Sequence, residues 1–261
     1  AVFAPLMAPL VLLMGVGPLA RWKSADAHEV ARLLRWPALA SVATALAVPV
    51  AAGRFSFGAA FGLLLAAWVA TSTALLLWRQ RRHGQAALWR AGASFWGMVV
   101  AHLGVAVFIV GVTMVRSYEA QADVKMSIGD HVDLAGWRFT LDGLNEAPGP
   151  NYVALRAQIT VTRDGAAPFT MQPEKRLYKV QSMPMTEAAI DTRIARDLYV
   201  ALGEAIDEKT WTVRVHHKPF VTWIWGGAFI MALGAALAIG DRRYRLAAAR
   251  TNPAPTVVVA P

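Results

Sequence analysis

Long apolar runs alternate with short basic clusters along most of this 261-residue chain, and a polar stretch at 116–218 interrupts the alternation. Five apolar runs are predicted to form membrane-spanning helices, because about twenty apolar residues match a hydrocarbon core about 30 Å thick. The second of these runs is the shortest. The five runs are 1–20, 37–52, 57–78, 95–115 and 220–240.

A mixed segment, 24–36, precedes the second run. Asp26 and Glu29 are suited to form a capping pair, and Val30 and Leu33 lie on an apolar side. The segment therefore predicts a short helix at the membrane interface. A plain connector between two spans explains it equally well.

The polar stretch is predicted to be β-rich, since eight short segments show alternation or β-branched runs separated by turn signals at 128–130, 148–151 and 163–165. Short strands at this spacing favour a small sandwich or a partly closed barrel. Only 186–191 is a candidate helix. The predicted strands are 123–126, 131–134, 137–141, 153–162, 170–172, 177–180, 197–202 and 211–217.

Four parts follow from this pattern. We expect a membrane region with four helices and two basic loops at 1–115, the β-rich domain at 116–218, a last spanning helix at 219–240, and a disordered tail at 241–261. The chain opens on an apolar run without Met or a charged leader. We therefore expect it to be the C-terminal part of a longer membrane protein.

The charges support a membrane topology rather than a nucleic-acid partner. The chain is 56% hydrophobic, 16% charged and +9 overall, but the polar stretch holds 13 basic and 14 acidic residues. The basic excess therefore lies beside the apolar runs, mostly in 21–35, 79–90 and 242–250. Basic loops stay in the cytoplasm, so the polar domain is expected in the periplasm and the C-terminus in the cytoplasm.

The chain contains no cysteine. That excludes a disulfide framework, a thiolate metal site and a cysteine nucleophile. Any redox role must then depend on a bound cofactor.

His102 is the strongest candidate for chemistry, because an ionisable side chain within a membrane span is a functional hypothesis by default. A neutral imidazole is a good ligand for haem iron. At 100° per residue, Gly97, Gly104 and Gly111 fall on one side of the helix, and His102 falls on the other among bulky apolar residues. The alternative is a structural histidine that bonds a neighbouring helix, for example at Thr71 or Ser72.

The other histidines are weaker candidates. His28 and His83 lie in predicted cytoplasmic loops, and His131 lies beside a turn. His216 and His217 are adjacent in a predicted strand, so they point to opposite faces and form a poor chelating pair. No nucleophile–base set or phosphate loop is recognisable, so catalytic residues stay unassigned.

Several separated segments together resemble the C-terminal part of CcmF, the haem lyase subunit of the bacterial cytochrome c maturation system. The resemblance covers nearly the whole chain except the tail beyond Arg245. The segments are PLVLLMGVGPLARWK (9–23), WGMVVAHLGVAVFIVG (96–111), GPNY (149–152), PEKRLY (173–178), MTEAAID (185–191), RDLYVALG (196–203) and KPFVTWIWGG (218–227).

The resemblance implies a protein of the bacterial inner membrane that attaches haem to the Cys-x-x-Cys-His motif of apocytochrome c. Its implied partners are a haem-loaded periplasmic chaperone and the subunits that present the apocytochrome thiols. It also implies a membrane-embedded haem b, with His102 matching one axial ligand to the iron in the family's His-Leu-Gly motif.

The second ligand and the Trp-rich haem-binding loop belong to an earlier part of the family and have no counterpart in these 261 residues. This chain alone is therefore not expected to attach haem. Two other functions remain open. One is a non-catalytic membrane scaffold whose outer domain binds maturation partners. The other is a transporter subunit, which the scarcity of polar residues in the spans disfavours.

Overall fold

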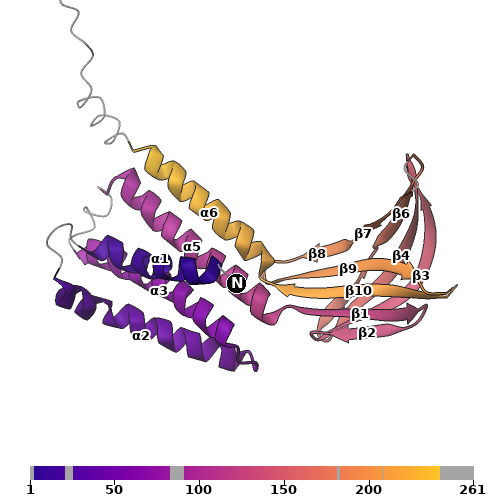
Figure 1. Ribbon diagram of the computed structural model, residues 1–261, viewed down its shortest axis with the longest axis horizontal. Coiled ribbons are helices and arrows are strands. Elements are labelled where there is room, and N and C mark those ends of the chain that lie inside the picture. Colours follow the sequence, from indigo (N-terminus) through magenta and orange to yellow (C-terminus); the bar gives the residue numbers. More distant parts are fainter. Residues whose placement is uncertain (1–2, 21–25, 83–90, 181–182, 208, 242–261) are drawn as a thin grey trace, which may run out of the picture. The chain divides into compact units, whose positions relative to one another are not determined.

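A computed structural model describes residues 3–20, 26–82, 91–180, 183–207 and 209–241 of the chain (Figure 1). It divides into two compact units, one of residues 1–110 with 225–261 and the other of residues 111–224. The predicted tail beyond residue 241 lies outside the described residues. So do His83 and parts of the three basic clusters, namely residues 21–25, 83–90 and 242–250.

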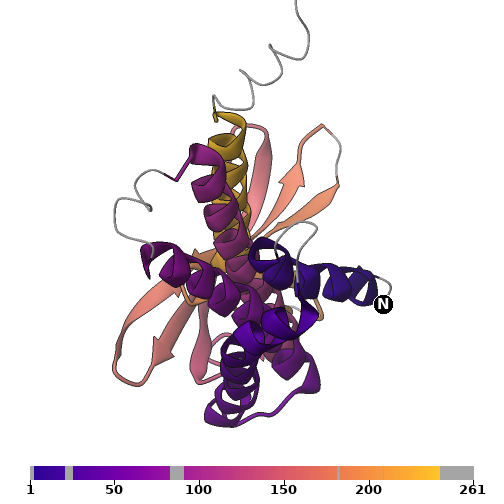
Figure 2. The ribbon, with the colours of Figure 1, turned by 90° about the vertical axis from the view of Figure 1, so that its left-hand side faces the viewer.

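The first unit is helical (Figure 2). Within the described residues, four helices are long and apolar enough to cross a membrane, and a shorter apolar helix precedes them. The predicted membrane α-helical class is confirmed. The helices are α1 (Phe3–Val16) with a 3-10 turn η1 (Gly17–Leu19), α2 (Ala27–Ala51), α3 (Phe57–Arg82), α5 (Ala93–Tyr118) and α6 (Val221–Ile239).

The prediction of about five spans is wrong at its first member. Helix α1 has 14 residues, which corresponds to about 21 Å at 1.5 Å per residue and falls short of a bilayer core. It gives way to the 3-10 turn at Gly17, where Pro18 has no backbone N–H to donate. Apolar composition alone overstated the length of this helix.

The second span is longer than predicted, and the separate interfacial helix at 24–36 is not formed. Helix α2 runs without a break through Pro37, so the expected interfacial segment is its first part. Asp26 caps the helix as predicted, accepting a hydrogen bond from the His28 backbone N–H at 2.9 Å. The sequence pattern did not predict one continuous helix, because Arg32 and Arg35 interrupt the apolar run near one end of it.

Helix α1 packs on α3 through a glycine. The ring of Trp68 occupies the place where a Cβ at Gly15 would lie, and its indole N–H donates to the Leu12 carbonyl at 2.9 Å. Helices α2 and α3 lie side by side (Figure 1). A small apolar core therefore forms among the helices, with Val11 and Val69 buried within it.

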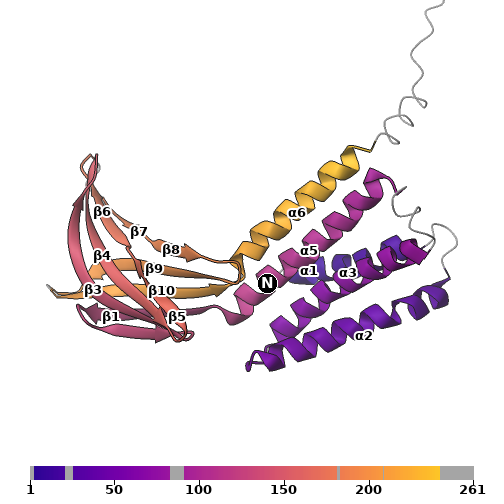
Figure 3. The ribbon, with the colours of Figure 1, turned by 180° about the vertical axis from the view of Figure 1, so that it is seen from behind.

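The second unit is an all-antiparallel sandwich, which confirms the predicted β-rich fold. One sheet has the order β1-β10-β9-β8 and the other β2-β3-β4-β6-β7, with β5 paired to β4 (Figure 3). The strands are β1 (Ala120–Ser127), β2 (His131–Leu134), β3 (Trp137–Pro148), β4 (Tyr152–Arg163), β5 (Ala166–Met171), β6 (Glu174–Tyr178), β7 (Pro184–Glu187), β8 (Ala189–Thr192), β9 (Arg196–Ala205) and β10 (Thr210–Pro219).

The sandwich core forms because alternate residues of both sheets face inward. Phe139 and Ile159 come from one sheet, and Val200 and Val215 come from the other. All four side chains are fully buried. The alternation that predicted the strands is therefore the pattern that fills the core.

The candidate helix at 186–191 is wrong. These residues form the end of β7 and most of β8, which belong to different sheets. Thr186 pairs with Lys175 of β6, and Ile190 pairs with Tyr199 of β9. The short Ala-containing run favoured a helix locally, but pairing with two longer strands determines its conformation.

Candidate functional site

Helix α5 carries the candidate site and presents two different faces. On one face, a Cβ at Gly97 would lie 2.5 Å from the Gly234 carbonyl oxygen, and one at Gly104 would lie 2.6 Å from the Met231 nitrogen. Helix α6 contributes Gly227 to the same contact, and a Cβ added there would lie 2.5 Å from the Phe108 backbone nitrogen. The predicted glycine face is confirmed as a close helix–helix contact, which fixes the rotation of α5.

His102 lies on the other face of α5 and is half-buried. Its Nδ1 is 2.8 Å from the Met98 carbonyl oxygen, one turn earlier. Because a carbonyl oxygen only accepts hydrogen bonds, Nδ1 is the donor, and the neutral imidazole with this tautomer has its lone pair on Nε2. The imidazole is thus oriented as a neutral ligand with Nε2 free to coordinate.

The face that carries His102 is apolar. One turn later along α5, Ala106 is buried together with Val11 of α1 and with Leu65 and Val69 of α3. The next apolar residue on this face, Ile109, packs against the same cluster. The surroundings therefore offer a low-polarity wall, which suits a neutral histidine and a large apolar group.

The suggested structural partners of His102 are committed elsewhere. The Thr71 hydroxyl donates to the Ala67 carbonyl at 2.6 Å, and the Ser72 hydroxyl donates to the Val69 carbonyl at 3.1 Å. The imidazole bonds within its own helix instead. A hydrogen bond from His102 to these two side chains is therefore not the arrangement formed.

A hollow of about 450 Å³ begins one turn before His102, a size within the range of small-molecule sites. His102 does not line the hollow itself, but Met98, which holds the imidazole, does. The lining residues are Pro18, Leu76, Gly92, Ser94, Phe95, Met98 and Asp241.

Asp241 was missed by sequence reasoning. Its buried carboxylate accepts a hydrogen bond from the Ser94 backbone N–H at 2.9 Å, which caps the first turn of α5. An acidic residue directly after an apolar span was the available signal, but the capped helix lies 147 residues away in sequence. This contact joins the end of α6 to the start of α5.

The remaining histidines differ in surroundings. His28 and His131 are exposed. His216 packs edge-to-face on Tyr199, with ring centroids 5.1 Å apart. Burial, with the nearby positive charges of Arg196 and Arg163, lowers the pKa of His217, so this imidazole is held neutral. Nothing in these positions brings two histidines onto one ligand.

Within the described residues, no group of three or more His, Asp or Glu side chains gathers to hold a free metal ion. A haem iron is a different case, because the porphyrin supplies four of its ligands and the protein one or two axial ligands. The free Nε2 of His102 and its apolar surroundings fit that requirement.

Comparison with known proteins gives a consistent result. Residues 117–219 match the family model described as the CcmF C-terminal beta-sandwich. The cytochrome c-type biogenesis protein CcmF of Pseudomonas aeruginosa is 45% identical over 251 residues, covering 94% of this chain and 38% of the relative. CcmF of Escherichia coli K12 is 40% identical over 257 residues, covering 98% and 39%.

A solved structure described as cytochrome c heme lyase CcmF shares the fold, with a TM-score of 0.71 at 23% identity. The match covers 91% of this chain and 39% of that one. The chain thus spans less than two fifths of the length of the relatives it matches.

Proposed function

Because this chain is homologous to the C-terminal part of the CcmF cytochrome c-type biogenesis proteins, we propose that it forms part of a haem lyase. It is an integral membrane protein. In the proposed reaction, haem from a periplasmic chaperone is attached to apocytochrome c, which other maturation subunits present with its thiols exposed. The bacterial inner membrane is the proposed location.

His102 is proposed as one axial ligand of a membrane-embedded haem b. The observation that carries the proposal is the hydrogen bond from Nδ1 to the Met98 carbonyl, which engages one ring nitrogen and leaves Nε2 as the coordinating atom on an apolar helix face. Haem supplies one-electron chemistry when bound. His102 would hold the iron, and the apolar residues beside it would exclude water.

The second axial ligand is proposed to come from outside these 261 residues. Among the described parts of the four candidate spans, the only other histidine is His28, in the first turn of α2. The described parts of these spans thus offer no second imidazole near the middle of the membrane. This supports a haem site that another part of the protein completes.

The glycine contact between α5 and α6 is proposed to position His102. A helix whose rotation is fixed on one face presents its opposite face reproducibly. Capping of α5 by Asp241, which follows the C-terminal end of α6, adds a second restraint between the two helices.

The β sandwich is proposed to lie in the periplasm and the C-terminus in the cytoplasm. The basic residues that flank α2, α3 and α6 support this orientation. Loss of α1 as a span does not alter it, because α2, α3, α5 and α6 still alternate across the membrane.

A scaffold that only binds maturation partners is the second candidate function. Val153, Leu177 and Pro184 are direct cross-strand neighbours on β4, β6 and β7. They form an exposed apolar row, with Val153 43% and Leu177 50% exposed. Such a row on the surface of a sheet is suited to a protein partner.

The test is covalent haem attachment to a reporter apocytochrome c in cells whose own copy of this protein is deleted. The protein carrying His102→Ala should lose attachment, measured by haem stain after denaturing electrophoresis. Leu177→Asp, which disrupts only the apolar row, should retain attachment if haem handling is the main function. Full attachment with His102→Ala and loss with Leu177→Asp would establish the scaffold function instead.

A further inference from the structure

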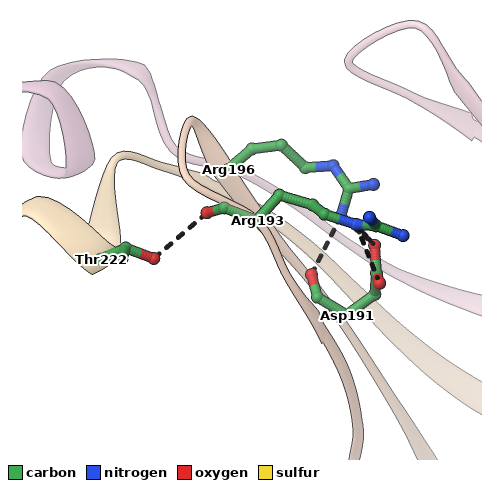
Figure 4. A network of polar contacts seen from close by, with 4 residues as sticks. All are labelled: Asp191, Arg193, Arg196 and Thr222. Carbon is green, nitrogen blue, oxygen red and sulfur yellow. Dashed lines mark hydrogen bonds and ion pairs between the residues drawn. The ribbon is translucent and has the colours of Figure 1, made fainter.

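The turn between β8 and β9, residues 193–195, is tied to the start of α6 by two hydrogen bonds, one of which, from Thr222, is drawn in Figure 4. The Thr222 hydroxyl donates to the Arg193 carbonyl at 3.1 Å. The Phe220 backbone N–H donates to the Ala195 carbonyl at 3.0 Å. Ile194, which lies between the two anchored carbonyls, is 77% exposed.

The anchoring helix sets the level of this turn. Helix α6 begins at Val221 and is a candidate membrane span of 19 residues, so its first turn lies at the boundary of the hydrocarbon core. Phe220 and Trp223 pack edge-to-face at this boundary with ring centroids 5.2 Å apart. Such aromatic residues are enriched where membranes meet water. We therefore expect the turn to lie at the membrane interface.

Three basic and two acidic residues gather beside Ile194, because Asp197 and its strand partner Lys218 lie near Asp191, Arg193 and Arg196. Asp191 is paired with two guanidiniums, those of Arg196 and, at 3.4 Å, Arg193. Arg196 is largely buried and also lies over the Trp137 ring, 4.5 Å from its centroid. The Arg193 side chain is 66% exposed, so it has N–H groups directed to its surroundings.

We propose that residues 193–195 form a membrane-interface anchor whose partner is a phospholipid of the adjacent leaflet. Ile194 enters the boundary between headgroups and acyl chains, and Arg193 binds the lipid phosphate. Arginine suits that role because its planar fork of N–H donors matches phosphate oxygens. The anchor would hold the start of β9 against the membrane independently of the proposed haem chemistry.

The same strand supplies a matched control. Ile206 is exposed and follows the far end of β9, which has ten residues and therefore extends about 33 Å. Its backbone N–H is bonded to the Thr210 carbonyl within the sandwich rather than to a spanning helix. If exposure of an isoleucine alone caused lipid contact, the two positions would behave alike.

The test uses the protein in nanodiscs with an environment-sensitive nitrobenzoxadiazole label. The chain contains no cysteine, so Ile194→Cys or Ile206→Cys provides its only thiol for labelling. Phosphatidylcholine bearing a nitroxide near the headgroup should quench the label at 194 at least about twofold and leave the label at 206 unchanged. Equal quenching at the two positions would overturn the proposal.

The phosphate contact is tested in the same nanodiscs. Adding Arg193→Gln to the 194-labelled protein should weaken the quenching, and replacing a third of the phosphatidylcholine by phosphatidylglycerol should strengthen it only when Arg193 is present. Quenching that is insensitive to Arg193→Gln would overturn the role of the guanidinium. Loss of the contact with haem attachment intact would leave the proposed enzyme function standing.

Discussion

Replacing Gly227 by alanine should force α6 away from α5. The added Cβ would lie 2.5 Å from the Phe108 backbone nitrogen and 2.7 Å from its Cα. These separations fall about 1 Å short of the 3.5–4.0 Å at which carbon contacts are most favourable. Backbone atoms of a helix cannot move aside individually, so the helices must separate. We expect a cost of about 1–3 kcal/mol, the usual range for overpacking.

Gly226 is the matched control, because a Cβ there meets nothing within 4 Å. Gly226→Ala should be neutral or stabilising by up to about 1 kcal/mol through helix propensity. The assay is thermal unfolding of the purified protein in detergent, followed by tryptophan fluorescence. At about 2–4 °C per kcal/mol, Gly227→Ala should lower the midpoint by about 2–12 °C. Equal midpoints for the two variants would refute close packing of α5 on α6.

Two further predictions concern the β sandwich. Glu174 is 7% exposed and accepts hydrogen bonds from Arg156 and Arg176, which outweigh burial and lower its pKa. Glu174→Gln should therefore cost about 2 kcal/mol, somewhat less than breaking a fully buried pair, because both guanidiniums reach solvent. Asp133→Asn, which breaks an exposed pair, should cost less than about 1 kcal/mol. Hydrogen exchange of the β6 amides measures the loss of sandwich stability in each variant, and equal losses of stability in the two variants would contradict the expectation. Because burial lowers the pKa of His217 from 6.5, sandwich stability should hold above that pH and decline as the pH falls below it. Unfolding midpoints between pH 7.5 and 5 should show a smaller decline for His217→Gln, and identical declines would disprove the assignment.

The apolar pattern predicted the long helices, but not all of their lengths. At the first run, the α-helix ends at Val16 and a 3-10 turn containing Pro18 follows, even though the residues around it are apolar. At the second, Arg32 and Arg35 lie inside a helix because long basic side chains near its end can extend toward water. The average hydrophobicity of a stretch of sequence reports neither effect.

The strands were predictable wherever alternation filled the core, as along β9 and β10. Strands β7 and β8 were not, since each has only four residues and owes its conformation to a longer neighbour. Local preference in so short a segment is weaker than strand pairing.

For the candidate site, helical periodicity was sufficient to separate the glycine face of α5 from the face of His102. The hydrogen bond to Met98 depends on a side-chain rotamer, and the capping contact of Asp241 depends on two helices meeting far apart in sequence. Neither contact is encoded in a local sequence pattern. The role of His102 as a haem ligand remains a prediction.

Chemical rescue of His102→Gly is the most direct test of the central claim. The purified protein should show the visible bands of a reduced low-spin b-type haem, and His102→Gly should lose them. Imidazole added to that variant should restore the bands by occupying the vacated position, whereas His131→Gly, at an exposed histidine, should leave the spectrum unchanged. An unaltered spectrum in His102→Gly, or bands lost and not restored by imidazole, would contradict ligation by His102.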